Sequence, residues 1–258
     1  MKRLRSLLVV ASVLCLPLGH LDAVTAPAIT STADNFVLAA QPDSNYGGAG
    51  ALQLASSANS KGEYQSLLRF DLTSTTAYFN TTYGVGHWTI TGVTLSLGTN
   101  FGTAGQQPNN AIFAPIAAGS FNVSWQADDS WLEGTGSPSA PTTDGITYNQ
   151  LPTYVSAAND RALGTFDFTA PGNNTVSTYA LGLDPSFVND VDAGGLVSMR
   201  LFAADNQVSY LFNSRSFGTA AQRPMLLVNA VPEPTTVAFL LVGLVIVATA
   251  RRRRTLSA

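Results

Sequence analysis

Ser66–Leu72 (SLLRFDL) decides the fold, because apolar and polar side chains alternate along it. Leu68 and Phe70 fall on one face of an extended chain, and Arg69 and Asp71 fall on the other. This period of two is typical of a β-strand that buries one face. For Arg69 and Asp71, which share a strand face, we expect a structural ion pair rather than contact with a ligand.

The same alternation recurs along the chain between stretches of turn residues. Eight further segments show it or resemble short strands: Asn35–Ala39, Leu52–Ala55, Val93–Leu97, Thr165–Thr169, Tyr179–Leu183, Val197–Leu201, Val208–Phe212 and Met225–Asn229. Glycine and proline dominate the spacers, notably at 47–50 and 134–141, which indicates loops. No long amphipathic helix competes with this pattern. The sequence therefore predicts an all-β fold, a two-sheet jelly-roll β-sandwich of about nine strands.

The composition suits a single exported domain. Only 11% of the 258 residues are charged, which is common in secreted β-proteins with many turns. Residues 29–230, the predicted ectodomain, have a length that suits one β-sandwich. This region holds six basic and fourteen acidic residues, because seven of the thirteen basic residues lie in the terminal segments. An acidic ectodomain repels phosphate backbones, so nucleic acid is not an expected partner.

Residues 1–28 are predicted to form a signal peptide. A positive segment at 2–5 precedes an apolar stretch at 7–18, which is too short for a comfortable membrane-spanning helix. Three small residues are candidate cleavage positions between which the sequence does not decide: Ala23, Ala26 and Ala28. Cys15, the only cysteine, lies in the apolar stretch, so we expect a mature protein without a thiol or disulfide.

The C-terminal segment, 231–258, has three parts. The tetrapeptide Val231-Pro232-Glu233-Pro234 comes first, an apolar run reaches Ala250, and Arg251, Arg252, Arg253 and Arg254 follow. Residues 235–250 are predicted to form a transmembrane helix of about 24 Å, slightly short for a hydrocarbon core of about 30 Å. The arginines extend its reach and stay cytoplasmic by the positive-inside rule, which leaves the ectodomain outside the cytoplasmic membrane.

This ending resembles the PEP-CTERM sorting signal of Gram-negative bacteria. The resemblance covers only the last 28 residues, and its tripartite pattern is specific. The two prolines oppose a helical extension, which keeps an extended peptide at the membrane surface. The resemblance implies an exosortase as partner and a final place at the cell surface or in the extracellular matrix, often with a link to exopolysaccharide export. An ordinary single-pass anchor is the alternative.

The ectodomain resembles the DNRLRE-type domain, a carbohydrate-binding-module-like β-sandwich of secreted bacterial proteins. The resemblance rests on collinear blocks: DNFVLAAQPDSNYGG (34–48), SLLRFDL (66–72), ITGVTLSL (90–97), WLEGTG (131–136), DGITYNQLP (144–152) and FNSRSFGTAAQRPMLLV (212–228). It implies the sandwich fold and, for some relatives, polysaccharide binding. Two positions depart from the family pattern, Ser216 after the Ser-Arg pair and Tyr148 in place of a tryptophan.

Saccharide binding requires a flat aromatic side chain for the apolar face of a sugar ring and polar groups for its hydroxyls. The candidate carbohydrate-binding residues are Trp88, Trp131, Tyr148, Asn149, Tyr154 and Arg161. Trp125 and Gln150 are further possibilities. For Trp125 and Trp131, which lie beside strand-like or motif positions, packing in the core is the competing interpretation.

No cofactor is expected, although calcium is possible. The weak calcium candidates are Asp34, Asp128, Asp129 and Glu133, with Asp43 as a partner for Asp34. A solvated acidic loop is the simpler interpretation of this cluster. The sequence contains no GxSxG, HExxH or Walker motif, and His87 is the only histidine of the ectodomain, which excludes a multi-histidine metal site. We therefore expect no catalytic residues.

Three functions remain open at this point. The first is a non-catalytic surface module that binds or organises extracellular polysaccharide after exosortase-dependent sorting. The second is a purely structural or adhesive spacer of the envelope, which buried tryptophans and a smooth polar exterior favour. The third is a polysaccharide lyase or hydrolase, which requires several carboxylate, tyrosine or arginine side chains to converge in one cleft.

Overall fold

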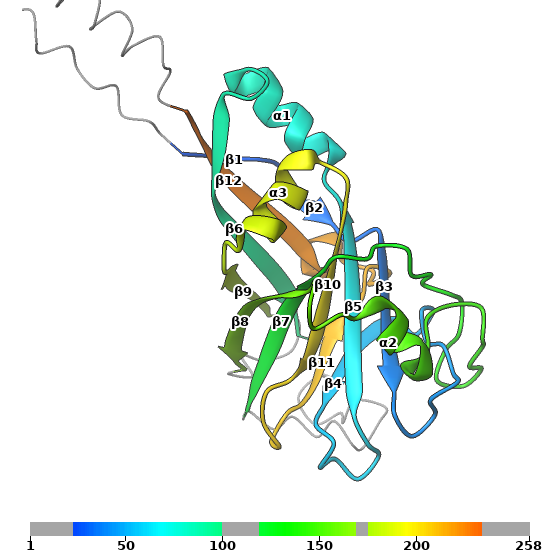
Figure 1. Cartoon of the computed structure of the whole chain (residues 1–258). Helices are drawn as coiled ribbons and strands as arrows, with labels where there is room; N and C mark the ends of the chain where they lie inside the picture. Colours follow the sequence, from blue (N-terminus) through cyan, green and yellow to red (C-terminus); the bar gives the residue numbers. More distant parts are fainter. Residues whose placement is uncertain (1–22, 100–118, 169–174, 234–258) are drawn as a thin grey trace, which may run out of the picture.

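The computed structural model describes residues 23–99, 119–168 and 175–233, and two antiparallel sheets form most of it (Figure 1). The first sheet contains β1 (Val24–Thr25), β2 (Ile29–Thr30), β6 (Trp88–Gly98), β9 (Val176–Leu181) and β12 (Met225–Pro232). Within it, β12 pairs with β1, β2 and β6, and β6 pairs with β9. This sheet contains both described ends of the chain.

The second sheet has seven strands: β3 (Ala33–Leu38), β4 (Ala51–Ala55), β5 (Tyr64–Asp71), β7 (Ser120–Gln126), β8 (Arg161–Asp167), β10 (Leu196–Ala203) and β11 (Ser209–Asn213). The order is β11-β4-β5-β10-β7-β8, and β3 also pairs with β5. The SLLRFDL stretch lies in β5, which therefore has three neighbouring strands. Both of its faces are largely buried, because one packs in the main core with Leu68 and Phe70 and the other packs with Leu67 against Trp131.

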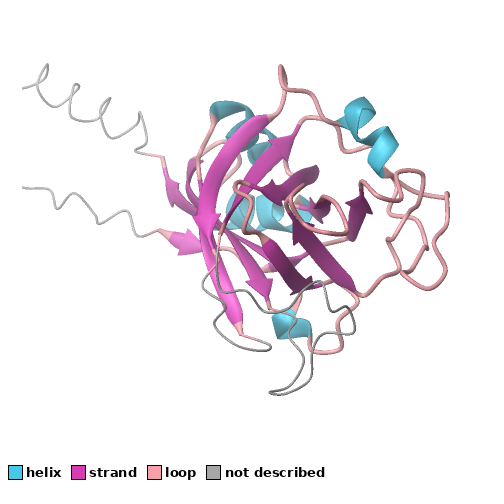
Figure 2. Cartoon of the chain, turned by 90° about the horizontal axis from the view of Figure 1, so that it is seen from below, coloured by secondary structure: helices cyan, strands magenta, loops and turns pink. Residues whose placement is uncertain are grey.

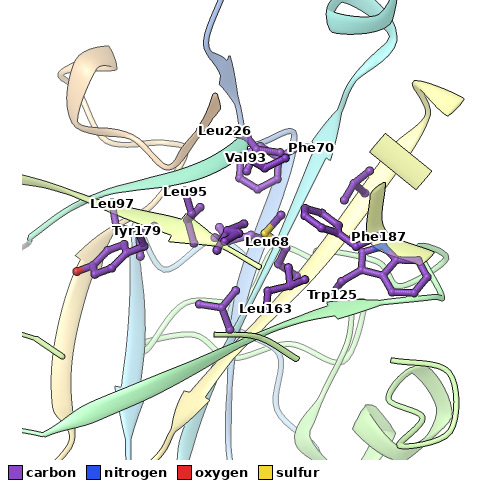
Figure 3. Packing of buried hydrophobic residues seen from close by; sticks show 14 of the residues in the cluster. Leu68, Phe70, Val93, Leu95, Leu97, Trp125, Leu163, Tyr179, Phe187 and Leu226 are labelled. Carbon is purple, nitrogen blue, oxygen red and sulfur yellow. The ribbon is translucent and has the colours of Figure 1, made fainter. Parts of the chain in front are cut away.

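The main core lies between the two sheets, as Figure 3 shows. Leu68 and Phe70 of β5 point toward Val93 and Leu95 of β6 and toward Leu226 of β12. The apolar face predicted from alternation is thus the face that packs in the core. The all-β class with two antiparallel sheets is confirmed, and the jelly-roll connectivity stays a prediction.

Within the described part of the chain, three helices supplement the sheets: α1 (Thr73–Tyr83), α2 (Leu151–Tyr154) and α3 (Pro185–Ala193). Two 3-10 turns span Tyr148–Gln150 and Ala220–Gln222. The sequence pattern did not predict α1, whose threonines and asparagine are poor helix formers. Phe79 of α1 is fully buried with its ring 4.9 Å from that of Trp88, so tertiary packing stabilises the helix.

Several strand predictions need correction. Strands β1, β2 and β7 had no counterpart among the predicted segments. The segment predicted at 179–183 is shifted, because β9 begins at Val176 and ends at Leu181. The other predicted segments fall on strands, although Thr169 lies outside the described residues.

The outer face of β5 is covered by the long segment between β7 and β8. Trp131 of this segment is fully buried in a small cluster with Val37 and Leu67. Arg69 lies over the Trp131 ring, with its guanidinium carbon 4.8 Å from the ring centroid. One of its terminal nitrogens donates to the carbonyl oxygens of Asp129 and Trp131, each at 2.8 Å. The expected ion pair with Asp71 is therefore wrong, since that carboxylate accepts from Thr73 instead.

Most of the predicted targeting segments fall outside the described residues. This applies to the signal peptide up to residue 22, to Pro234, to the predicted transmembrane helix 235–250 and to Arg251–Arg254. Among the helices that the structure describes, none combines the length and the apolar character needed to cross a membrane.

Candidate functional site: an aromatic pocket and the start of the sorting motif

A pocket of about 530 Å³ lies where β3, β4 and β5 meet the loops that follow β3 and precede β5. Eleven residues line it: Phe36, Leu38, Ala40, Gln41, Tyr46, Gln53, Ser60, Lys61, Gly62, Tyr64 and Pro138. Alternation along β4 creates this second compartment. Leu52 and Leu54 enter the main core, whereas Ala55 joins the cluster beside the pocket and Gln53 lines the pocket.

Aromatic side chains form one wall of the pocket. The rings of Phe36 and Tyr46 are stacked, with centroids 4.6 Å apart and planes inclined by 7°. Tyr64 lies 5.9 Å from Phe36 at a tilted angle, and the Tyr46 hydroxyl donates to the Gln41 side chain. Burial raises the pKa of Tyr46 and of Tyr64, so both hydroxyls stay protonated at neutral pH. The wall is thus apolar, with neutral hydroxyls as its only polar groups.

Gln53 supplies a polar group without a partner. Its side chain is only 6% exposed, and its Oε1 atom accepts no hydrogen bond. The backbone of Gln53 is fixed, because its N–H donates to the Ser66 hydroxyl and its carbonyl accepts from that hydroxyl. A buried amide oxygen without a donor costs about 1–3 kcal/mol. This oxygen is itself buried, so a hydroxyl or N–H donor of a ligand removes the cost only if the Gln53 amide turns toward the pocket.

The loop before β5 forms the entrance. Asn59 shapes it, since its side chain accepts from the backbone N–H of Lys61 and its carbonyl accepts from Gly62. Gly62 has a φ of +90°, which other residues rarely adopt, so glycine is required at this turn. Lys61 itself is exposed and lines the pocket, where it brings a positive charge to an otherwise acidic domain.

The pocket and the chain ends lie at opposite ends of the molecule. Residues 60–62, which precede β5, line the pocket, and in Figure 1 β5 runs upward from this loop to α1, with β1 and the end of β12 beside α1. Figure 2 likewise shows long loops gathered on the side away from the two described ends. The segment that precedes the predicted membrane anchor therefore leaves the domain far from the pocket.

The three tryptophans do not provide exposed platforms. Trp131 is fully buried, and Trp88 and Trp125 are 6% and 8% exposed. Each indole N–H has an internal acceptor: Asn80 for Trp88, Asp190 for Trp125 and Ser198 for Trp131. The structure thus places all three in the core, as the competing interpretation of Trp125 and Trp131 proposed.

The other saccharide candidates do not line the pocket. The Tyr148 hydroxyl donates to Glu63 at 2.9 Å, and the Asn149 amide donates to Asp43 at 2.7 Å. Tyr154 is half-buried against the Trp131 cluster. Arg161 donates to the carbonyl oxygens of residues 158–160. These side chains contact their own chain, and they do not converge with the pocket aromatics. Phe36 and Tyr46, which do line the pocket, were not among the sequence-based candidates.

Three sequence blocks far apart in the chain meet around Asp34. Glu133 accepts from Arg215 through both carboxylate oxygens, each at 2.6 Å, and from the backbone N–H of Asp34 at 3.0 Å. The backbone N–H of Arg215 donates to the Asp34 carboxylate. Burial raises the pKa of Asp34 to about 7, and the nearby Glu133 charge adds to this effect. Asp34 therefore titrates near neutral pH.

Asn45 connects the same region to the glycine-rich loops. It is fully buried, and its amide nitrogen donates to the carbonyl oxygens of Glu133 and Ile146 at 2.8 and 2.9 Å. Its amide oxygen accepts from the backbone N–H groups of Gly47 and Gly136. All of these partners are backbone groups, so Asn45 has a structural role.

The calcium candidates do not assemble into one site. Glu133 and Asp34 are engaged with Arg215, Asp128 accepts from Ser130 at 2.8 and 2.5 Å, and burial raises the pKa of Asp129 to about 6. Within residues 23–99, 119–168 and 175–233, no group of three or more histidine, cysteine, aspartate or glutamate side chains is placed to hold a metal ion.

The tetrapeptide begins on the last strand. Val231 and Pro232 pair with Thr89 and Trp88, and the N–H of Glu233 donates to the carbonyl oxygen of His87 at 2.9 Å. Residues 230–254 match the family model of the PEP-CTERM protein-sorting motif. This match confirms the sorting signal that the sequence predicted, and no curated protein matches the chain. The motif implies an exported, membrane-anchored precursor that an exosortase processes and that is sorted to the cell surface.

Proposed function

We propose that this exosortase-sorted surface protein binds extracellular polysaccharide, without catalysis, in the pocket between β3, β4 and β5. The observation that carries the proposal is the pairing of an apolar aromatic wall with the unpartnered Gln53 oxygen. A sugar ring offers both complements, an apolar C–H face and hydroxyl donors. The volume of about 530 Å³ lies in the range of small-molecule sites, roughly 300–1,000 Å³.

The lining supports binding rather than hydrolysis. Among the described residues that line the pocket, none is aspartate or glutamate. Glycoside hydrolysis generally requires two carboxyl groups on either side of the scissile bond. Gln53 and Lys61 orient a ligand and do not supply that chemistry.

We also infer that the sandwich is a jelly roll of the DNRLRE type. The support is spatial, because the blocks that carry the resemblance converge on Asp34, Asn45, Glu133 and Arg215. Convergence of separate motifs through hydrogen bonds is typical of residues that specify a shared fold. A carbohydrate-module-like sandwich fits a surface protein of a polysaccharide-rich matrix.

The test is binding to a glycan array and to the host's own exopolysaccharide, followed by Gln53→Met. This variant keeps the side-chain length and removes the acceptor, so we expect affinity to fall about tenfold. We also expect stability to rise by about 1–3 kcal/mol, because a buried unpaired oxygen is removed. Gln207→Met, at an exposed position outside the pocket, is the control. The proposal is wrong if no glycan binds, or if Gln53→Met binds as tightly as the wild type.

A structural or adhesive spacer is the second candidate function. The burial of all three tryptophans and the Asn45 network favour it, because both serve stability rather than recognition. On this alternative, the protein binds no glycan, yet its deletion weakens cohesion of the cell-surface layer. Loss of cohesion together with a negative glycan array therefore supports the spacer and opposes the pocket proposal.

A further inference from the structure

The sorting motif is not separated from the folded domain by a linker. The motif match begins at Ala230, which is fully buried in the main core and pairs with Ile90. The pairing with β6 then continues through Val231 and Pro232. The first residues of a signal that an enzyme must recognise therefore belong to a strand of the sandwich.

Hydrogen bonds outside the regular ladder fasten this strand end. The backbone N–H of Glu233 donates to the His87 carbonyl oxygen at 2.9 Å, and the Thr89 hydroxyl donates to the Glu233 carboxylate at 3.2 Å. From α1, the Tyr83 hydroxyl donates to the carbonyl oxygen of Ala230 at 3.3 Å. Contacts thus reach the motif from both β6 and α1.

Further contacts fix β6 and α1, the elements against which the motif residues lie. The Trp88 indole donates to Asn80 of α1 at 2.9 Å, and its ring packs 4.9 Å from Phe79. On the other edge of β12, Val24 and Thr25 of β1 pair with Ala230 and Asn229. Asn229 and Ala230 are therefore held along both edges, and Val231 and Pro232 are held by β6, so the strand end cannot leave β6 without breaking several contacts.

A strand in the middle of a sheet has its backbone N–H and C=O groups engaged by its neighbours. An enzyme that binds an extended peptide competes for these groups, so it acts on a locally opened state. We propose that the folded domain guards its own sorting motif: residues 230–233 must detach from β6 and α1 before the exosortase engages them. This inference depends on exosortase sorting and is independent of polysaccharide binding.

The first test loosens the contacts and leaves the motif unchanged. The full-length precursor carrying Tyr83→Phe and Thr89→Ala loses two hydrogen bonds to residues 230 and 233. Each lost bond raises the detached population roughly fivefold, and the processing rate rises with it. Pulse–chase conversion of precursor to processed form in exosortase-containing cells measures this rate. Thr94→Ala, opposite Leu227 on the same strand pair but away from the motif, is the matched control and is expected to leave the rate unchanged.

The second test prevents the motif from detaching from β6. Thr89→Cys with Val231→Cys places two thiols at directly paired positions, within reach of a disulfide. Thr94→Cys with Leu227→Cys joins the same strands upstream of the motif. Oxidation is expected to block processing at least tenfold in the first pair alone, with recovery after reduction.

Two results overturn the proposal: unchanged processing of the Tyr83→Phe/Thr89→Ala precursor, or processing of the oxidised 89–231 pair at the rate of the 94–227 pair. The second of these results includes equal inhibition by both disulfides, because position relative to the motif then has no effect. If the reduced 89–231 variant is not processed, the loosened variant, whose motif is intact, decides the question.

Discussion

Asp34→Asn is expected to remove most of the pH dependence of stability near neutral pH. In the native protein, burial raises the pKa of Asp34 from 3.8 to about 7. The native state therefore holds the Asp34 proton more tightly than the unfolded chain does. Stability contributed by this proton is complete below pH 3.8 and is lost as the pH rises to about 7. A pKa difference of about three corresponds to about 4 kcal/mol.

The substitution isolates this effect because it retains the local contacts. An asparagine oxygen can still accept from the Arg215 N–H, and Glu133 keeps its two hydrogen bonds with Arg215. We expect the free energy of unfolding of the wild type to fall, relative to Asp34→Asn, by about 4 kcal/mol between about pH 4 and about pH 8. Asp129, with a pKa of about 6, contributes to both profiles and cancels in the difference.

Urea unfolding at a series of pH values measures the difference directly. Asp144→Asn is the control, because hydrogen bonds from Thr142 and Thr135 lower the pKa of the exposed Asp144 to about 2. That group is ionised in both the folded and unfolded states above about pH 5, so its variant should run parallel to the wild type there. Parallel profiles for Asp34→Asn as well would refute the burial argument.

Two further predictions concern the Asn45 hydrogen bonds and the first residue of the mature chain. Asn45→Ala removes the acceptor of the Gly47 and Gly136 N–H groups, while the Glu133 and Ile146 carbonyls still accept from Asn35. It should lower the free energy of unfolding by about 2–3 kcal/mol in urea titration, whereas Asn149→Ala, at an exposed position, should cost under about 1 kcal/mol. The mature chain should begin at Val24, because cleavage after Ala26 or Ala28 removes β1 and a buried core residue. Mass spectrometry of the processed N-terminus checks this, and a start beyond Ala26 contradicts it.

The sequence predicts the strands well where apolar and polar side chains alternate. Alternation located β5, β10 and the central part of β6, because a period of two reflects the direction of each side chain. It did not locate α1, whose residues are poor helix formers and whose stability comes from burial of Phe79 on Trp88. Packing between distant segments has no local signature, so this element required the structure.

The candidate site was harder to predict for a related reason. Tryptophan was the natural choice for a sugar-binding platform, yet Trp131 is fully buried and its ring lies under Arg69. Phe36 lies in a predicted strand, and Phe36 and Tyr46 both lie in a block that resembles a family, but neither was a candidate for sugar binding. Nothing in the amino-acid sequence distinguishes an aromatic residue that lines a pocket from one in the core. Chain topology decides this, because alternation along β4 directs Gln53 away from the main core and into the pocket.

The placement of the pocket and the sorting motif links the two proposals. β1 and the end of β12 pair with each other, so the described chain begins and ends at the same end of the sandwich. The sorting motif begins at this end, and it implies a membrane-anchored precursor. The pocket lies toward the opposite end, where Tyr64 begins β5. A membrane-held precursor in this orientation presents the pocket outward while the motif is still docked on β6. Glycan binding therefore needs no prior detachment of the motif, and Gln53→Met should weaken binding equally in the precursor and in the processed protein.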